Sequence, residues 1–375
     1  MKELLSKHVN NNFRVLSDIG EAPNNLDIIF FTLGTGIPVY PDKLDLSEIE
    51  HLLCSISEKL DAKVYVFRTT LPIGTIDFLS EKYPNIELAF VPERLIEGDA
   101  IAEESRLPKI IGTYSDQAFE TLKMFFSSIG GDILRVKNPR TAEFCKLTDN
   151  SYRNLTFAFS NDLAITAEHN KVDVYEVIES VNYGYNRNNI KSPGFVSGYC
   201  LGKDPYIFEY AYPDKELNNH SIIYSSRKNN DYLYEYFSDK IFEINPKTIS
   251  IFGLSFKADV DDFRMSHSGN IITKIKNKLD TCQIQTYDPY MNNNDYTNQY
   301  KLDKSVIVID NILDDRLYKC DLLIILTPHS EIRTIERNQL MCNLEKFGPC
   351  VLDAWNAWSD LDGRYDKYNS FGRGK

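Results

Sequence analysis

Short apolar runs alternate with stretches of helical spacing over the first third of the chain. The apolar runs predict buried strands at DIIFFTLG (27–34), AKVYVFRTT (62–70), IELAFVPER (86–94) and DILRVK (132–137). The segment LSEIEHLLCSISEKL (46–60), which lies between two of them, has the apolar spacing of a helix. Unbroken apolar strands that alternate with helices predict a parallel sheet covered on both faces.

The pattern changes to helix from about residue 139 and returns to strand–helix alternation after residue 246. Residues 141–172 contain neither Pro nor Gly and predict one long helix, which is followed by a loop at 192–206, SPGFVSGYCLGKDPY. Strands are then expected at TISIFGL (248–254), CQIQTYDP (282–289), DLLIILTP (321–328) and PCVLDAW (349–355). This order predicts an α/β chain with three domains, at residues 1–138, 139–240 and 241–375.

Composition narrows the class of protein. The chain has 375 residues, 42% of them hydrophobic, and a formal net charge of −12, which argues against a nucleic-acid partner. No apolar run approaches the roughly 18 residues of a membrane span, and the N-terminal stretch lacks the apolar core of a signal peptide. The 7 cysteines of the chain are widely spaced without a CxxC pair, so we expect reduced thiols in the cytoplasm rather than disulfides or a zinc site.

Cys200 lies in a segment of unusual composition. Gly194, Gly198 and Gly202 permit close approach of the backbone to a ligand, and Lys203 and Asp204 follow directly. A cationic neighbour favours the nucleophilic thiolate, and a carboxylate can act as a base or orient water. The alternative interpretation is a buried structural cysteine in a glycine-rich turn.

The predicted long helix carries a polar stripe. Lys146, Asn150 and Asn154 are spaced by four residues and therefore share one face, and Asn161 lies near its continuation. Such a stripe could stabilise an oxyanion by positive charge and amide donors. A solvated helix face explains the same pattern equally well.

Three further segments combine strand ends with polar groups. In GLSFKADVDDFRMS (253–266), Lys257 and Arg264 flank three aspartates after a predicted strand, which suits phosphate binding. RTTLPIGT (68–75) and PERLIEGDA (92–100) follow two strands of the first sheet, where open α/β sheets bind ligands. The alternative explanation for residues 253–266 is a charged surface turn. For residues 68–75 and 92–100 it is the ordinary use of Thr, Pro and Gly in turns and helix caps.

These motifs, in this order, resemble the UDP-glucose/GDP-mannose dehydrogenase family over essentially the whole chain. TTLPIGT resembles the family's STxPxGT, PERLIEGDA its PERxxxGxA, and AEFCKLTDNSYR its AExxKLxxNxYR. SPGFVSGYCLGKDPY resembles PGxxGGxCLxKDPY, and GLSFKADVDDFRMS resembles GLxFKxxxDDxRxS. The wording is closest to the UDP-N-acetyl-D-mannosamine dehydrogenase branch.

The resemblance implies oxidation of the C6 alcohol of a UDP-sugar to a uronic acid with NAD, for polysaccharide precursor synthesis. Cys200 would form a thiohemiacetal and then a thioester with the substrate. The implied catalytic residues are Cys200, Lys146, Asn150, Asp204, Thr70 and Glu93. The implied cofactor-binding residues are Thr70, Glu97, Lys203 and Arg264. The implied substrate-binding residues are Glu93, Lys146, Asn150, Gly194, Gly198 and Lys257, with no metal. The family also implies a homodimer formed through the central helix.

The chain departs from the family pattern in three places. Ser197 stands where the family usually has Gly, which is expected to crowd the nucleotide sugar, and Met265 stands where it often has Glu. The sequence also contains no strand–GxGxxG–helix segment. We therefore expect a truncated Rossmann-like first domain in which DIIFFTLG has an unpaired edge, with FRVLS (13–17) or another chain as candidate partners.

Three functional hypotheses follow. The first is a UDP-sugar 6-dehydrogenase with weak or no activity as this chain alone. The second is a catalytically silent nucleotide-sugar binder or assembly partner, and the third is a hydroxyacid dehydrogenase, which would not need Cys200.

Overall fold

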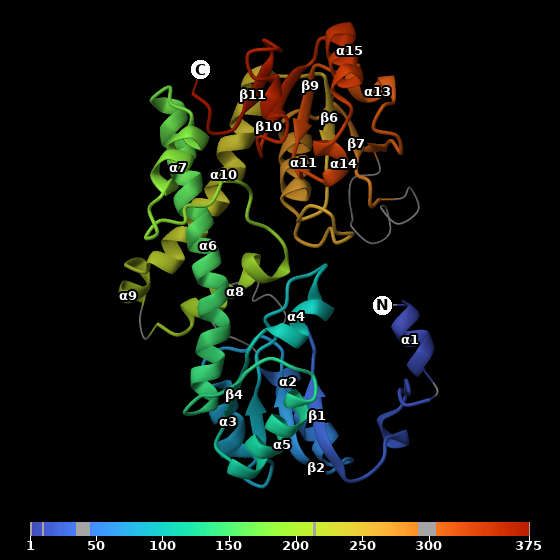
Figure 1. The fold of residues 1–375 in the computed structure, drawn as a ribbon, viewed down its shortest axis with the longest axis vertical. Coiled ribbons are helices and arrows are strands. Elements are labelled where there is room, and N and C mark those ends of the chain that lie inside the picture. The colour runs from blue at the N-terminus through green and yellow to red at the C-terminus, as the bar shows by residue number, and fades with distance from the viewer. Residues whose placement is uncertain (1, 10, 35–45, 213–214, 292–304, 375) are drawn as a thin grey trace. The chain divides into compact units, whose positions relative to one another are not determined.

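A computed structural model describes residues 2–9, 11–34, 46–212, 215–291 and 305–374. The chain divides into two compact units, Met1–Leu147 and Thr148–Lys375. Each is described by itself below, and Figure 1 identifies their elements. No helix of the described residues is long and apolar enough to cross a membrane.

The first unit contains a sheet with the order β1-β2-β3-β4-β5. Its strands are β1 (Leu26–Phe31), β2 (Ala62–Phe67), β3 (Leu88–Phe90), β4 (Lys109–Thr113) and β5 (Ile133–Arg135). Its helices are α1 (Lys2–His8), η1 (Ile19–Glu21), α2 (Ser47–Ser57), α3 (Thr75–Lys82), α4 (Ala100–Arg106) and α5 (Asp116–Ser127). Apolar clusters lie on both faces of this sheet, as the unbroken apolar strands predicted.

Two expectations for this sheet are wrong. The sheet is mixed rather than parallel, because β4 pairs antiparallel with β3, while β1 with β2, β2 with β3 and β4 with β5 pair in parallel. FRVLS (13–17) forms no strand: Phe13 makes an isolated bridge with Val9, and Val15 is 76% exposed. Among the described residues β1 pairs with β2 alone, so it lies at the edge of the sheet.

The second unit joins a helical region to a parallel sheet. The long helix α6 (Pro139–His169) begins in the first unit and confirms the prediction from residues 141–172. The other helices of the region are α7 (Val174–Asn182), α8 (Tyr199–Glu209), α9 (Lys215–Asn219) and α10 (Ile222–Ile244).

The C-terminal sheet has the order β11-β10-β9-β6-β7-β8, and its neighbouring strands are parallel. Its strands are β6 (Thr248–Phe252), β7 (Gln283–Tyr287), β8 (Ile307–Val308), β9 (Leu322–Ile325), β10 (Cys350–Asp353) and β11 (Tyr368–Ser370). Its helices are α11 (His267–Lys278), α13 (Asp315–Tyr318), α14 (Ser330–Arg333), α15 (Arg337–Phe347) and η2 (Ser359–Leu361). Residues of β6, β7, β9 and β10 enter separate apolar clusters on the two faces of the sheet.

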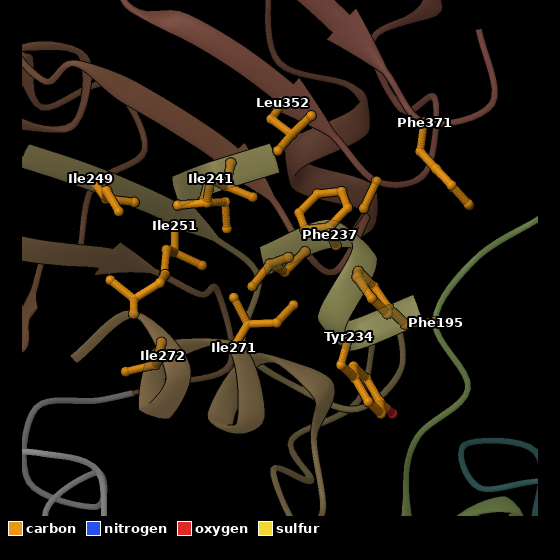
Figure 2. Close-up of a cluster of buried hydrophobic side chains, with 14 of the residues drawn as sticks. Phe195, Tyr234, Phe237, Ile241, Ile249, Ile251, Ile271, Ile272, Leu352 and Phe371 are labelled. Atoms are coloured by element: carbon orange, nitrogen blue, oxygen red, sulfur yellow. The ribbon is translucent and has the colours of Figure 1, made fainter. Parts of the chain in front are cut away.

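One of these clusters joins the helical region to the sheet. Figure 2 shows Phe195, which precedes α8, beside Tyr234 and Phe237 of α10, with Ile249 and Ile251 of β6 in the same cluster. The Phe195 and Tyr234 rings are stacked with centroids 5.6 Å apart. The segment that leads to Cys200 is therefore part of a core that includes the C-terminal sheet.

Candidate active site

The segment 192–206, which was expected to be a loop, is irregular only up to residue 198 and is helical after it. Residues 193–198 have no regular structure and are buried, but α8 begins at Tyr199, so Cys200, Lys203 and Asp204 stand on a helix. Gly198 precedes the helix with φ of 85°, a conformation that favours glycine. Cys200 is exposed and is the second residue of α8, where the helix dipole favours a negative charge.

A helix continues through Pro205 because another side chain replaces a missing backbone donor. Proline has no N–H for the carbonyl four residues earlier, which here is Leu201 O. The Arg227 Nη1 atom of α10 donates to Leu201 O at 3.3 Å and to Asn154 Oδ1 at 3.1 Å. Arg227 is fully buried and also pairs with Asp231 at 2.5 Å. Arg227 lies outside the sequence motifs, so nothing in the sequence marked it for this role.

Asn150, Lys203 and Asp204 form one buried cluster. Asn150 Nδ2 donates to Asp204 Oδ2 at 2.6 Å, and Lys203 Nζ donates to Asp204 Oδ1 at 2.6 Å. Asp204 is 0% exposed and Lys203 is 2% exposed. The Lys203 ammonium, which was expected at phosphates, thus serves as the counter-ion of Asp204 within α8, and the charge-assisted bond from Asn150 joins α6 to α8.

The polar stripe of α6 is buried rather than solvated. Asn154 accepts from Arg227 and Asn230, while Asn161 holds both backbone groups of Gly194. Gly194 N donates to Asn161 Oδ1 at 2.8 Å, and Asn161 Nδ2 donates to Gly194 O at 3.0 Å. These side chains therefore fix the segment before Cys200.

The C-terminal sheet domain holds the same segment from its other side. A Cβ atom added to Gly194 would lie 2.2 Å from the Trp355 ring, and one added to Gly198 would lie 2.4 Å from the Phe256 ring. Gly198 N also donates to Met265 O at 3.2 Å. Both glycines that were expected to approach a substrate thus approach side chains of the C-terminal domain.

The loop that carries Lys257 and Arg264 is held by buried polar groups. Both residues are exposed, and Arg264 makes several bonds to Asp262. Ser255 and His329 both contact Asp288 Oδ2, at 3.1 and 2.9 Å. Burial disfavours the Asp288 carboxylate, but its hydrogen bonds from His329 and backbone N–H groups keep its pKa below the ordinary value.

The first unit holds the remaining predicted site residues. Lys146 of α6 is buried, and its Nζ donates to the backbone oxygen of Glu93 after β3. Thr70 is buried at the carboxyl end of β2, whereas Glu97 is exposed in the turn before α4. The structure therefore joins Lys146 with the Glu93 backbone.

Glu143 is a residue of this region that sequence reasoning missed, although it stands in the AEFCK motif. Its carboxylate accepts from Gly74 N at 2.5 Å and from Ile76 N at 2.8 Å, and so caps α3 directly after the TLPIGT motif. Burial raises the pKa of Glu143 to about 7, although the two backbone N–H groups favour its charged form.

Three domain models of one family match the chain. The NAD binding domain of the UDP-glucose/GDP-mannose dehydrogenase family matches residues 1–129, its central domain residues 140–232, and its UDP binding domain residues 250–360. The chain belongs to the UDP-glucose/GDP-mannose dehydrogenase family. It is therefore an NAD-dependent UDP-sugar dehydrogenase by family, with three domains of the expected α/β kind.

Individual relatives agree with this assignment. The chain is 27% identical over 306 residues to UDP-N-acetyl-D-mannosamine dehydrogenase of Methanocaldococcus jannaschii, a match that covers 80% of this chain and 67% of the relative. It is 27% identical over 340 residues to NDP-N-acetyl-D-galactosaminuronic acid dehydrogenase of Ralstonia nicotianae, covering 84% and 75%.

Solved structures show the same fold. UDP-D-ManNAc dehydrogenase from Pyrococcus horikoshii superposes with a TM-score of 0.83 at 24% identity, covering 100% of this chain and 86% of that one. UDP-N-acetyl-mannosamine dehydrogenase from Staphylococcus aureus superposes with a TM-score of 0.77 at 25% identity, covering 99% and 85%.

Proposed function

We propose that this chain oxidises the C6 alcohol of a UDP-N-acetylmannosamine-type or UDP-glucose-type sugar to a uronic acid through Cys200. The observation that carries the proposal is an exposed thiol on the first turn of α8, in a segment clamped on the UDP-binding domain. The names of the curated relatives favour an N-acetylated sugar.

The described residues fit binding of NAD at the carboxyl ends of the first sheet's parallel strands. Thr70 presents a buried hydroxyl at the end of β2, and Thr69 Oγ1 donates to Leu33 O, which joins the segments after β1 and β2. Thr70 and Glu97 would contact NAD, and two NAD molecules bound in succession would each accept one of the two hydrides.

The protein's own groups divide the remaining chemistry. The Cys200 thiolate adds to the C6 aldehyde, and the resulting hemithioacetal oxygen takes a proton. Loss of the hydroxyl proton and of the second hydride then gives the thioester. Water adds to the thioester carbonyl, the C–S bond breaks to leave the Cys200 thiolate, and the new carboxylic acid gives up its proton. In this proposal Lys146 and Asn150 stabilise the oxyanion, Asp204 and Glu93 move protons, and Lys257 and Arg264 approach substrate or phosphate groups.

The test is NADH formation and acid release by the purified chain with UDP-N-acetylmannosamine and with UDP-glucose. Cys200→Ala is expected to lower acid formation by a factor on the order of 100 or more, because the aldehyde has no covalent partner. Cys342→Ala is the matched control, because Cys342 is also an exposed thiol. Acid formation by Cys200→Ala at the unaltered rate overturns the proposal. UDP-sugar binding without any turnover supports the silent binding protein instead.

We also propose a homodimer through the face of α6 that carries Tyr152 and Phe159. These side chains are seven residues apart, share one helix face, and are 65% and 52% exposed. Phe159→Glu is expected to shift the sedimentation coefficient to that of a monomer, whereas the same substitution at the exposed Met124 of α5 should not.

A further inference from the structure

The hydroxyl of Ser197 connects the Cys200 segment to a buried histidine. Ser197 Oγ lies 2.8 Å from His267 Nδ1 and 3.1 Å from Phe256 O, and Ser197 is 9% exposed. The side chain therefore points into the contact with the C-terminal domain. The crowding of nucleotide sugar that was expected from a serine at this position finds no support in that orientation.

The partners of His267 define the direction of this hydrogen bond. His267 is 0% exposed and its Nε2 lies 2.5 Å from Leu326 O, which can only accept, so Nε2 carries a proton. Burial lowers the pKa of His267 to about 4, so the ring is neutral near pH 7 and Nδ1 is an acceptor. The Ser197 hydroxyl has one proton for two acceptors, and the shorter contact, to Nδ1 at 2.8 Å, takes it in preference to Phe256 O at 3.1 Å.

The ring of His267 also supports the neighbouring aromatic side chain. Phe195 stacks on His267 with centroids 4.8 Å apart and an interplanar angle of 15°. The His267 ring thus contacts both Phe195 and Ser197, which lie on either side of Val196. A continuous path of bonds runs from the end of β9 through this ring to a position three residues before Cys200.

We propose that Ser197 and His267 are positioning residues that set the first turn of α8 and thereby the orientation and reactivity of the Cys200 thiolate. Gly198, which lies between Ser197 and the helix, donates its N–H to the Met265 carbonyl, accepts from Gly202 N within the helix, and has no side chain of its own. The direction in which α8 starts therefore depends on how Ser197 is held. The part of this inference that concerns turnover rests on the proposed function.

Ser268, which follows His267 in α11, provides a matched control. Ser268 is 1% exposed and its Oγ bonds to Leu254 O at 3.1 Å and Ser266 Oγ at 3.0 Å, two partners that lie outside the Cys200 segment. Ser268→Ala removes a buried hydroxyl with a similar loss of hydrogen bonding. It separates a general loss of stability from a specific effect on Cys200.

The first measurement is the rate of Cys200 alkylation by iodoacetamide, read by peptide mass spectrometry relative to Cys342 in the same molecules. Cys200 is already exposed, so access does not limit the reaction, and its rate reports the thiolate. Ser197→Ala is expected to slow Cys200 alkylation about two- to fivefold, because the thiolate loses its fixed place at the helix N-terminus. Ser268→Ala should leave the ratio of the two rates unchanged.

The second measurement separates kcat from KM. Ser197→Ala is expected to lower kcat for acid formation about three- to tenfold with KM for the UDP-sugar changed less than about twofold, as for loss of one hydrogen bond that acts on the reacting group. His267→Phe should have the same effect, because Phe keeps the stacked ring and removes the acceptor. The double variant should be no slower than the slower single variant, since both act through one bond.

Rescue by His267→Asn provides a further check, because the Asn oxygen can take the place of Nδ1 as acceptor for Ser197. This variant is expected to recover part of the alkylation rate that His267→Phe loses. An unaltered Cys200 rate in Ser197→Ala, or equal effects of Ser197→Ala and Ser268→Ala, overturns the proposal. If Cys200→Ala keeps acid formation, the proposed function fails, and the alkylation ratios still decide the role of Ser197 and His267.

Discussion

The amide of Asn150 donates a 2.6 Å hydrogen bond to Asp204, and Lys203 donates a second 2.6 Å bond to the same carboxylate. All three side chains are buried, so the carboxylate has exchanged water for one amide and one ammonium group. A buried charge is tolerated only when it is paired and hydrogen-bonded. The stability of α8 therefore depends on partners that are close to Cys200 in the sequence and on α6.

Asp204→Asn is expected to lower the free energy of unfolding of the second unit by about 3–5 kcal/mol, because Lys203 becomes an unpaired buried cation. Urea denaturation followed by circular dichroism measures this loss. Replacing both partners, Lys203→Met with Asp204→Leu, should recover most of the stability. An Asp204→Asn variant that unfolds at the unaltered urea concentration would contradict the description of this pair.

Gly194→Ala is expected to destabilise the second unit by about 1–3 kcal/mol, because the new methyl group overlaps a well-packed ring. The ring is that of Trp355, 2.2 Å from the added Cβ. Gly269→Ala in α11 is the control, since nothing lies within 4 Å of its added Cβ and alanine favours a helix. The melting temperature should therefore fall for Gly194→Ala and stay unchanged or rise for Gly269→Ala.

The raised pKa of Glu143 predicts that the stability of the first unit depends on pH. Its pKa is raised from 4.5 to about 7, so the folded state binds the proton more tightly than the unfolded state. The stabilisation is present below pH 4.5 and is lost, by about 3 kcal/mol in total, as the pH rises through 7. Amide exchange in α3, corrected for its intrinsic pH dependence, should show this loss. Glu143→Gln should abolish it, and Glu120→Gln at an exposed site should not.

The lowered pKa of His267 predicts the opposite pH dependence for the stability of the second unit. Its pKa is lowered from 6.5 to about 4, so the unfolded state takes up the proton first. Stability is then full above pH 6.5 and falls by about 3 kcal/mol as the pH decreases towards 4. Exchange of the α11 amides should report this, and His267→Phe should remove it. Equal behaviour of both units between these pH values would contradict both assignments.

The apolar pattern predicted most of the strands, because strands buried on both faces of a sheet consist of apolar residues. The predicted runs at 62–70, 248–254 and 321–328 contain β2, β6 and β9, and the run at 27–34 covers all of β1 except its first residue, Leu26. The direction of a strand has no such signature, so the antiparallel pairing of β4 with β3 was not predictable from an apolar run. Short strands with little burial, such as β8, also give no clear pattern.

The candidate site was predictable where its residues are adjacent in sequence. Cys200, Lys203 and Asp204 stand together in one motif, and Asn150 follows from helical spacing. The helix around them was not predictable, because Pro205 and two glycines indicate a loop, and the Arg227 side chain that satisfies Leu201 O comes from 26 residues away. Glu143 caps α3 over a separation of 67 residues at Ile76, which likewise leaves no local signal.

The close packing of Trp355 on Gly194 gives the protein an intrinsic optical reporter. The chain has 2 tryptophans, and the other, Trp358, is 0% exposed with its indole N–H bonded to Ile332 O. Indole emission responds to its immediate surroundings, and Trp355 alone of the two touches the segment before Cys200. Fluorescence of the unmodified protein, with Trp355→Phe as the blank, therefore follows movement of the thiol's segment without any added label.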